Sequence, residues 1–347
     1  MGEVWLAERS SAGKHSQLVA VKFLGNASKG GTLAAEALRM SRLSHDNIVP
    51  FIDSGHDAGG RFFIAMSYVR GVDLEDLRDL VGITKDAAYL GQIEHRVPDQ
   101  IVGFVMFMVL RALQYAHTYD FGDGVIGLIH RDVSPGNILI DEARGFVKLT
   151  DFGVAVKQSS KTMQTDIAGK VPYMAKEVLT GGAVDIRSDL YALGLVAYEL
   201  LTGINPNVHP AKLVSVVSAI TDVMISLEKP LRPPHEVIRG IDTDLSKIVV
   251  RLLATSPEER YSSAESVIAD LSIYLYDHGV GPTTESLAQY IQLVRNPKLE
   301  ISKHARRDLG FLTGQDNEID VFPRWELTPQ AARALAAGLN PGRVSDG

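Results

Sequence analysis

Two short apolar runs near the start of the chain have the pattern of β-strands. In residues 18–24 a two-residue period places Ala20 and Lys22 on the same face of the chain. Residues 62–69 follow the turn-forming pair Gly59-Gly60 and are predicted to form a strand that runs into an extended connection. A single lysine in an apolar strand is usually an exposed edge residue, so a buried Lys22 would need a specific role.

Helical spacing of apolar residues dominates the rest of the chain. We expect helices over residues 73–80, 98–117, 188–203, 211–225, 245–253 and 264–276, and a partly helical pattern over residues 32–43. The helix at 188–203 has Ser188 as its cap and Gly203 at its end, and its apolar residues cover nearly every side, which predicts burial. The longest apolar run, residues 101–110, is shorter than the about 20 residues that a bilayer span requires, so we interpret it as a buried helix.

The most informative stretch is polar. Residues 130–137 read His-Arg-Asp-Val-Ser-Pro-Gly-Asn, and two apolar runs follow, 138–140 and 147–149, on either side of a turn-forming segment. The second run leads into Asp151-Phe152-Gly153. Two apolar runs around a turn predict a β-hairpin, which would hold the two polar motifs close together.

Three side chains in these motifs supply groups that phosphoryl transfer requires: the carboxylates of Asp132 and Asp151 and the amide of Asn137. Transfer of a γ-phosphoryl group needs a carboxylate to orient the attacking hydroxyl and oxygen ligands for the metal ions that bridge the phosphates. The pattern therefore predicts a phosphoryl-transfer site. A second copy of the tripeptide, Asp120-Phe121-Gly122, lacks flanking strands and is interpreted as a turn.

The two motifs resemble the catalytic loop, H-R-D-x-x-x-x-N, and the metal-binding loop, D-F-G, of protein kinases. The resemblance covers about residues 1–278 and points to bacterial serine/threonine kinases of the eukaryotic type. It implies an α+β fold of two lobes, a small β-rich lobe with one helix and a larger, mainly α-helical lobe. The implied boundaries are 1–66 for an incomplete small lobe without its first strand, 67–278 for the hinge and large lobe, and 279–347 for a regulatory or partly disordered C-terminal extension.

The resemblance also assigns the nucleotide site. It implies that Asp132 orients the substrate hydroxyl, that Lys22 binds the phosphates and pairs with Glu36 on the next helix, and that Asn137 and Asp151 bind Mg²⁺, with Mn²⁺ as an alternative ion. The remaining residues expected around ATP are Gly2, Val4, Ala20, the gatekeeper Met66, the hinge residues Tyr68 and Val69, and Leu139. The apolar members of this set equally fit plain core packing.

The beginning of the chain departs from the family pattern. Only the last part of the glycine-rich loop, Gly2-Glu3-Val4, is present. We interpret Met1 as an internal methionine taken for the start, or the chain as a fragment. If the loop is truncated in the functional protein, the cover over the ATP phosphates is halved and nucleotide affinity should fall.

A second departure lies beside the catalytic aspartate. Related serine/threonine kinases usually carry lysine two residues after this aspartate and threonine after the glycine that precedes the peptide-binding segment, whereas this chain has Ser134 and Lys170 there. We hypothesise an exchange in which Lys170 reaches Asp132 and the γ-phosphate as a catalytic group and Ser134 takes the hydroxyl role. Further along, Glu177 is expected to pair with Arg260.

Other residues are assigned by the same resemblance. Asp189 is expected to anchor the backbone of the catalytic loop, and Thr162 and Thr165 are candidates for phosphorylation that orders the segment after Gly153.

Composition narrows the function classes further. The net charge of -7 over 347 residues argues against a nucleic-acid-binding protein, and the absence of cysteine excludes disulfides, thiolate zinc sites and cysteine nucleophiles. The chain opens without a basic region and apolar core, so we expect neither a signal peptide nor a membrane span and place the protein in the cytoplasm. Dimerisation is left open.

The sequence thus predicts a kinase that transfers the γ-phosphoryl group of ATP to Ser and Thr hydroxyls of protein substrates and phosphorylates its own activation loop. One alternative is a pseudokinase scaffold, which the short glycine-rich loop would favour. Another is a small-molecule kinase, against which stand the long segment from Asp151 to Glu177 and the expected pair of Glu177 with Arg260.

Overall fold

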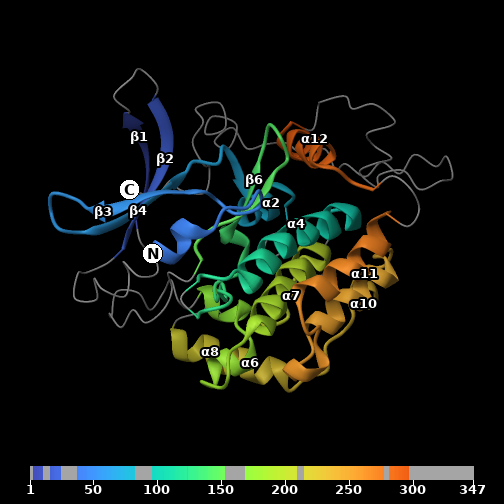
Figure 1. Cartoon of the computed structure of the whole chain (residues 1–347). Coiled ribbons are helices and arrows are strands. Elements are labelled where there is room, and N and C mark those ends of the chain that lie inside the picture. The colour runs from blue at the N-terminus through green and yellow to red at the C-terminus, as the bar shows by residue number, and fades with distance from the viewer. Residues whose placement is uncertain are drawn as a thin grey trace.

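A computed structural model of the chain describes residues 3–10, 16–24, 37–82, 96–122, 124–152, 169–208, 215–276 and 281–296. Within these residues a β-sheet formed by the N-terminal part of the chain lies beside a larger helical body (Figure 1). The predicted α+β architecture of two lobes is confirmed.

The small lobe is built on an antiparallel sheet with the strand order β1-β2-β4-β3. Its strands are β1 (Val4–Ser10), β2 (Ser16–Leu24), β3 (Phe51–His56) and β4 (Phe62–Ser67). In the register, Lys22 pairs with Val4 on one side and Ile64 on the other, while Ala20 pairs with Leu6 and Met66. Lys22 therefore lies on an inner strand of the sheet, and β1 forms the edge.

A second, smaller sheet carries the predicted hairpin. Its strands are ordered β5 (Gly71–Asp73), β6 (Ile138–Asp141) and β7 (Val147–Leu149), and β6 pairs with β7 antiparallel. The predicted strand over 62–69 ends at Ser67, and a connection without regular secondary structure, residues 68–70, leads into β5. The short helix α2 (Leu74–Leu80) follows, with Asp73 as its N-cap. Ile138, Ile140 and Leu149 are fully buried, so apolar packing fixes the hairpin in the core.

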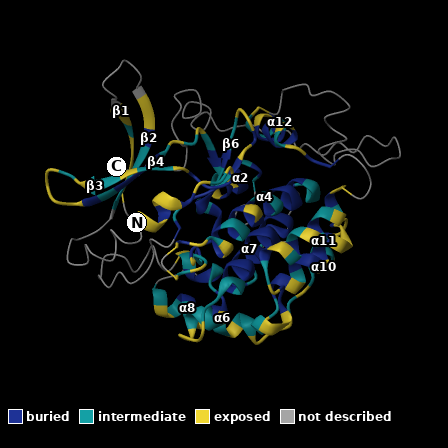
Figure 2. Ribbon diagram, viewed as in Figure 1, coloured by how far each residue is buried: buried dark blue, intermediate teal, exposed yellow. Residues whose placement is uncertain are grey.

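The helical body is organised around α7 (Ile186–Thr202), which packs against α4 (Asp99–Thr118) and α10 (Thr243–Leu252). Around them lie α6 (Lys176–Leu179), α8 (Val216–Leu227), α9 (Pro234–Val237) and α11 (Ala264–Tyr276), with the short 3-10 turns η2 (Pro135–Asn137), η4 (Val171–Tyr173) and η5 (Pro257–Glu259). The interior of this body is formed by buried residues of α4 and α7 (Figure 2).

The sequence predicted the C-terminal end of α7 correctly and its N-terminal cap wrongly. Gly203 ends the helix in a left-handed conformation with φ 72°, as a terminal glycine should. The start is different: the cap is Asp185, whose side chain accepts the N–H of Arg187, and Ser188 lies inside the helix. Ser188 is used elsewhere, because its hydroxyl donates to Glu177 Oε1 at 2.8 Å.

Helix α4 is longer than the apolar run that predicted it. By length and composition it could cross a membrane, but 67% of its most apolar window is buried inside the fold. Burial on this scale is typical of a core helix of a folded domain.

One more helix, α12 (Thr284–Arg295), lies in the region that the sequence assigns to a C-terminal extension. It begins with a capping box formed by Thr283 and Ser286, and Leu287, Tyr290 and Ile291 belong to the same buried core as α4 and α7. In Figure 1 it lies beside α2 and the β6 strand. The rest of the extension, residues 279–280 and 297–347, lies outside the described residues.

Candidate active site

The backbone of the catalytic loop is held by a buried carboxylate. Asp189, 1% exposed on α7, accepts the backbone N–H of His130 and that of Arg131, both at 2.8 Å, and Nε2 of His117 donates to the same group at 2.8 Å. Arg131 has φ 65°, a left-handed conformation that side-chain-bearing residues rarely adopt. The hydrogen bonds that Asp189 accepts compensate this strain and fix the position of the next residue, Asp132. The predicted role of Asp189 as anchor is confirmed.

The imidazole of His130 locks the loop to the end of the hairpin. Burial lowers the pKa of His130, so the ring is neutral near physiological pH. Its Nε2 donates to the carbonyl of Thr150 at 2.8 Å, and its Nδ1 accepts the N–H of Asp132 at 3.2 Å. The ring also packs on Phe152, with centroids 4.4 Å apart. His130 therefore connects the loop that carries Asp132 to the one that carries Asp151.

Asp132 is buried, and among the described residues its side-chain contacts are made through one carboxylate oxygen, Oδ2. The amide nitrogen of Asn137 donates to Asp132 Oδ2 at 2.9 Å and to its backbone carbonyl at 2.7 Å. Lys170 Nζ forms an ion pair with the same Oδ2. The structure therefore brings Lys170 to Asp132, although the two lie far apart in the sequence.

Asp151 forms the second half of the site. Its Oδ2 accepts a hydrogen bond from Lys22 Nζ at 2.6 Å, and both side chains are largely buried. The N–H of Thr150 donates to the carbonyl of Asn137 at 3.0 Å, so the hairpin keeps the two predicted metal ligands close, as expected. Glu36, the predicted partner of Lys22, lies outside the described residues, as do Gly2, Thr162 and Thr165. In the described part of the chain the partner of Lys22 is Asp151.

The donor set suits a divalent metal that also binds phosphate. Asp151 Oδ1 is buried and has no hydrogen-bond partner among the described residues, which is unfavourable unless a ligand compensates it. Within the same residues, no group of three or more His, Cys, Asp or Glu side chains could enclose an ion. Mg²⁺ is typically held by one or two protein oxygens together with phosphate oxygens, so Asp151 and Asn137 fit such an ion.

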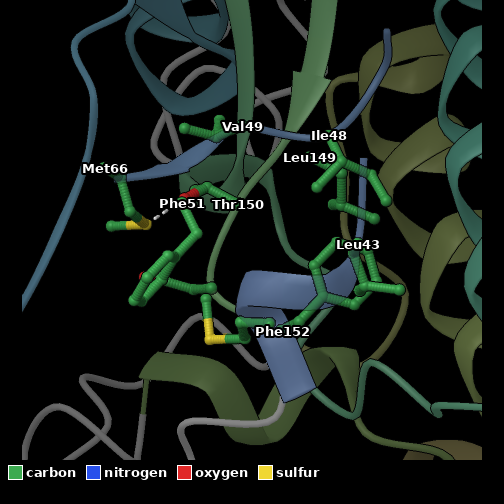
Figure 3. A pocket seen from close by; sticks show the side chains of 10 residues that line it. Leu43, Ile48, Val49, Phe51, Met66, Leu149, Thr150 and Phe152 are labelled. Carbon is green, nitrogen blue, oxygen red and sulfur yellow. Dashed lines mark hydrogen bonds between the residues drawn. The ribbon is translucent and has the colours of Figure 1, made fainter. Parts of the chain in front are cut away.

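The residues predicted around the adenine follow the connection between the lobes. Met66 is buried and forms part of the wall of a pocket between β4 and the segment 149–152 (Figure 3). The hydroxyl of Thr150 donates to its sulfur at 3.6 Å. Tyr68 is 40% and Val4 54% exposed. Both exposed side chains are accessible to a ligand, whereas Met66 is also a core residue.

The pocket behind Met66 is apolar on most sides. Met40 and Leu43, from the helical turn at 37–42 and just after it, line it together with Phe51 and Phe152. Figure 3 shows Leu43 and Phe152 on the side of the pocket away from Met66. Asp151 also lines it, so the motif predicted to bind the metal lies between this pocket and the catalytic loop.

The segment after the catalytic site is anchored by a second buried ion pair. Arg260 binds Glu177 through two hydrogen bonds, of 2.7 and 3.1 Å, which confirms the predicted pair. Burial acts to raise the pKa of the Glu177 carboxyl, but hydrogen bonds from Arg260 and Ser188 hold the pKa below its usual value. Glu177 is therefore charged in the folded protein.

A third polar cluster was not predicted. Glu199 on α7 accepts a hydrogen bond from Arg78 on α2 at 2.9 Å and one from the hydroxyl of Tyr173 in η4. A signal was present in the sequence, because Glu199 is a charged residue in a helix that is otherwise apolar on nearly every side, and such a residue needs a partner. Its partners could not be identified from local patterns.

Comparisons with known proteins agree with this geometry. Residues 1–271 match the protein kinase domain family. The chain is 31% identical to the tyrosine-protein kinase MasK of Myxococcus xanthus, over 84% of this chain and 44% of that protein. It is 31% identical to the probable serine/threonine-protein kinase PknB of Bifidobacterium longum, over 88% of this chain and 42% of that protein.

The chain is 33% identical to the serine/threonine-protein kinase PknB of Mycobacterium tuberculosis, over 68% of this chain and 34% of that protein. The chain thus spans less than half the length of these curated relatives. Among solved structures, the PknI kinase domain of Mycobacterium tuberculosis superposes with a TM-score of 0.54 at 27% identity, over 78% of this chain and 90% of that domain. The chain belongs to the protein kinase family, among the bacterial kinases of the eukaryotic serine/threonine type.

Proposed function

We propose that this chain is an ATP-dependent protein kinase that transfers the γ-phosphoryl group to Ser and Thr hydroxyls of protein substrates. The observation that carries the proposal is the joint placement of Asp132, Asn137, Asp151 and Lys22 through direct hydrogen bonds. Each of these groups has a task in phosphoryl transfer, and the hairpin and Asp189 hold them before any ligand binds.

The tasks follow from the contacts. Asp132 orients the substrate hydroxyl and accepts its proton, using the oxygen that Asn137 and Lys170 leave available. Lys22 binds the α- and β-phosphates, and Asp151 and Asn137 hold Mg²⁺, or Mn²⁺ in its place. A bound metal ion neutralises the charge of the phosphates during transfer. Glu36 is proposed as an additional partner of Lys22, and Gly2, Val4, Ala20, Met66, Tyr68, Val69 and Leu139 as the surroundings of the nucleotide.

Two observations favour a protein substrate and an active enzyme. The buried Glu177–Arg260 pair fixes the segment that follows the activation loop, which a kinase for small molecules would not need. No catalytic side chain predicted within the described residues is replaced, which argues against a pseudokinase scaffold. Since the reaction consumes ATP, we place it in the cytoplasm, with autophosphorylation at Thr162 or Thr165 as a part of its regulation.

The choice of hydroxyl is the finer question, because one relative of similar identity is named a tyrosine kinase. Most of the curated relatives compared are named serine/threonine kinases, and we propose that specificity here.

The test is transfer of labelled phosphate from ATP to the chain itself and to a generic protein substrate, followed by identification of the phosphorylated amino acids. We expect phosphoserine and phosphothreonine with the wild type and a loss of at least about 10³-fold with Asp132→Asn or Asp151→Asn. Asp120→Asn is the matched control, since Asp120 belongs to the second Asp-Phe-Gly and is exposed. Equal rates for the wild type and Asp132→Asn would refute kinase activity, and phosphotyrosine as the main product would refute the proposed specificity.

A further inference from the structure

A lysine from outside the catalytic loop lies against the catalytic carboxylate. Lys170 Nζ contacts Asp132 Oδ2, the oxygen that also accepts the amide of Asn137. The permanently charged cation within the loop is Arg131, and it is exposed whereas Asp132 is buried. A buried carboxylate is unfavourable without a partner of opposite charge. Lys170 is therefore the positively charged partner of the Asp132 carboxylate among the described residues.

The contact also places a positive charge near the reacting atoms. In the described part of the chain, the side-chain hydrogen bonds of Asp132 go to Oδ2, so a substrate hydroxyl can approach Oδ1 to about 3 Å. The phosphorus under attack lies about 3–3.5 Å from that hydroxyl in a reactive geometry. An ammonium group bound to Asp132 is then close to the oxygens on which negative charge develops.

We infer that Lys170 is a catalytic residue of phosphoryl transfer, and that this protein carries the cation on the segment after residue 168 instead of on its catalytic loop. The inference rests on the proposed kinase function. In the reaction the substrate oxygen bonds to the γ-phosphorus while the bond from that phosphorus to the β,γ-bridging oxygen breaks. The electron pair of the broken bond leaves with ADP, and the hydroxyl proton passes to Asp132. Lys170 neutralises the charge on the phosphoryl group in transit, a task for which the uncharged Ser134 has no means.

The position of Lys170 depends on how the next three residues dock. Lys170 directly precedes η4, in which Val171 is 1% exposed and packs against Ala219 and Val223 of α8. The carbonyl of Pro172 accepts a hydrogen bond from Asn207 at 3.0 Å, and Tyr173 is bonded to Glu199. Packing of η4 against α7 and α8 therefore places the Lys170 ammonium group beside Asp132. The catalytic site is complete only when this peptide-binding segment is docked.

The experiment compares Lys170→Met with the wild type in steady-state kinetics. Methionine keeps most of the side-chain length and removes the charge. We expect kcat to fall about 10²-fold or more, while KM for ATP changes less than about 3-fold. The reason is that the interaction of Lys170 with the transferred phosphoryl group forms mainly in the transition state. Lys176→Met, at an exposed position on α6, is the matched control and should behave as the wild type.

A relocation variant keeps the test decisive if Lys170→Met is also less stable. Adding Ser134→Lys to Lys170→Met returns a cation to the loop beside Asp132, and we expect at least about a tenfold recovery of kcat. A wild-type kcat in Lys170→Met would overturn the inference, while an inactive Asp132→Asn in the same assay would leave the kinase function standing. Loss of activity without recovery in the double variant would also overturn it, because the role would then be structural. An inactive wild type would remove both proposals.

Discussion

The carboxylate of Asp189, on α7, should be essential for the position of the catalytic loop. We consider Asp189→Asn, which keeps the shape of the side chain and replaces one oxygen by an NH₂ group. Asp189 accepts three hydrogen bonds, two of them at Oδ2, from His130 and His117, and one at Oδ1, from Arg131. The best orientation of the amide keeps its oxygen at the Oδ2 position and turns the NH₂ group toward the N–H of Arg131.

The cost follows from these contacts. A hydrogen bond to a charged group contributes about 1.5–3 kcal/mol, and one such bond is lost while two others become neutral and weaker by about half. We therefore expect a destabilisation of about 3–5 kcal/mol, a large part of a typical folding free energy of about 5–15 kcal/mol. For a domain of this size the melting temperature should fall by about 10 °C.

Activity should fall as well. Without its hydrogen bond, Arg131 can leave its left-handed conformation, with φ 65°, and displace Asp132. A misplacement of about 1 Å costs about 10²-fold in rate. We would measure the melting temperature by calorimetry and kcat at a temperature at which the variant is folded.

Asp185→Asn is the matched control, because Asp185 lies on the same helix, caps its first turn and has a side chain that is 47% exposed. Asparagine is as good a cap as aspartate, and the ion pair with Arg187 is screened by solvent, so the expected loss is below about 1 kcal/mol. If Asp189→Asn melts within about 2 °C of Asp185→Asn and keeps its full kcat, the anchoring role of Asp189 is wrong.

Two further predictions concern the periphery of the site. The folded-state pKa of Glu177 lies below its ordinary value of 4.5, so its contribution to stability is complete above that value and is lost as the pH falls through the folded-state value. As the pH is lowered from about 6 to about 3, the free energy of unfolding should fall more steeply for the wild type than for Glu177→Gln. Equal slopes would show that the ion pair of Glu177 with Arg260 contributes nothing to stability. Gly145→Ala places a Cβ atom 1.7 Å from the carbonyl oxygen of Thr284 at φ 66°, whereas Gly122→Ala has comparable strain at φ 74° and open space. The first variant should melt several degrees lower than the second, and equal melting temperatures would contradict the packing of α12 on the hairpin.

The elements that the sequence predicted well are those defined by local patterns. The hairpin of β6 and β7 follows from two apolar runs around a turn, and the end of α7 from a glycine with a left-handed conformation. The residues predicted for catalysis and metal binding, Asp132, Asn137 and Asp151, were recognised for a similar reason, since they lie at fixed positions relative to that hairpin; their roles stay predictions.

The elements that it did not predict depend on contacts distant in the chain. Asp120-Phe121-Gly122 does form a turn, with Gly122 at φ 74°, but Phe121 is 6% exposed and its carbonyl accepts a hydrogen bond from Arg42 at 2.8 Å. The start of α7 was misplaced because Asp185 and Ser188 are both good caps. In the structure Asp185 caps the helix, and the hydroxyl of Ser188 donates to Glu177, a residue distant from it in the pattern that predicted the helix.

The hairpin of β6 and β7 makes contacts at both of its ends. These contacts determine which parts of the chain must fold together. At one end, Asn137 and Asp151 form the predicted metal site. At the other end, Gly145 lies directly against the first turn of α12, and Glu142 forms an ion pair with Arg295 at the end of that helix. The match to the kinase family stops at residue 271, before α12 begins. Because α12 buries Leu287 and Ile291 in the common core and packs against the hairpin turn, the unit that folds together includes α12, beyond the last residue of the family match.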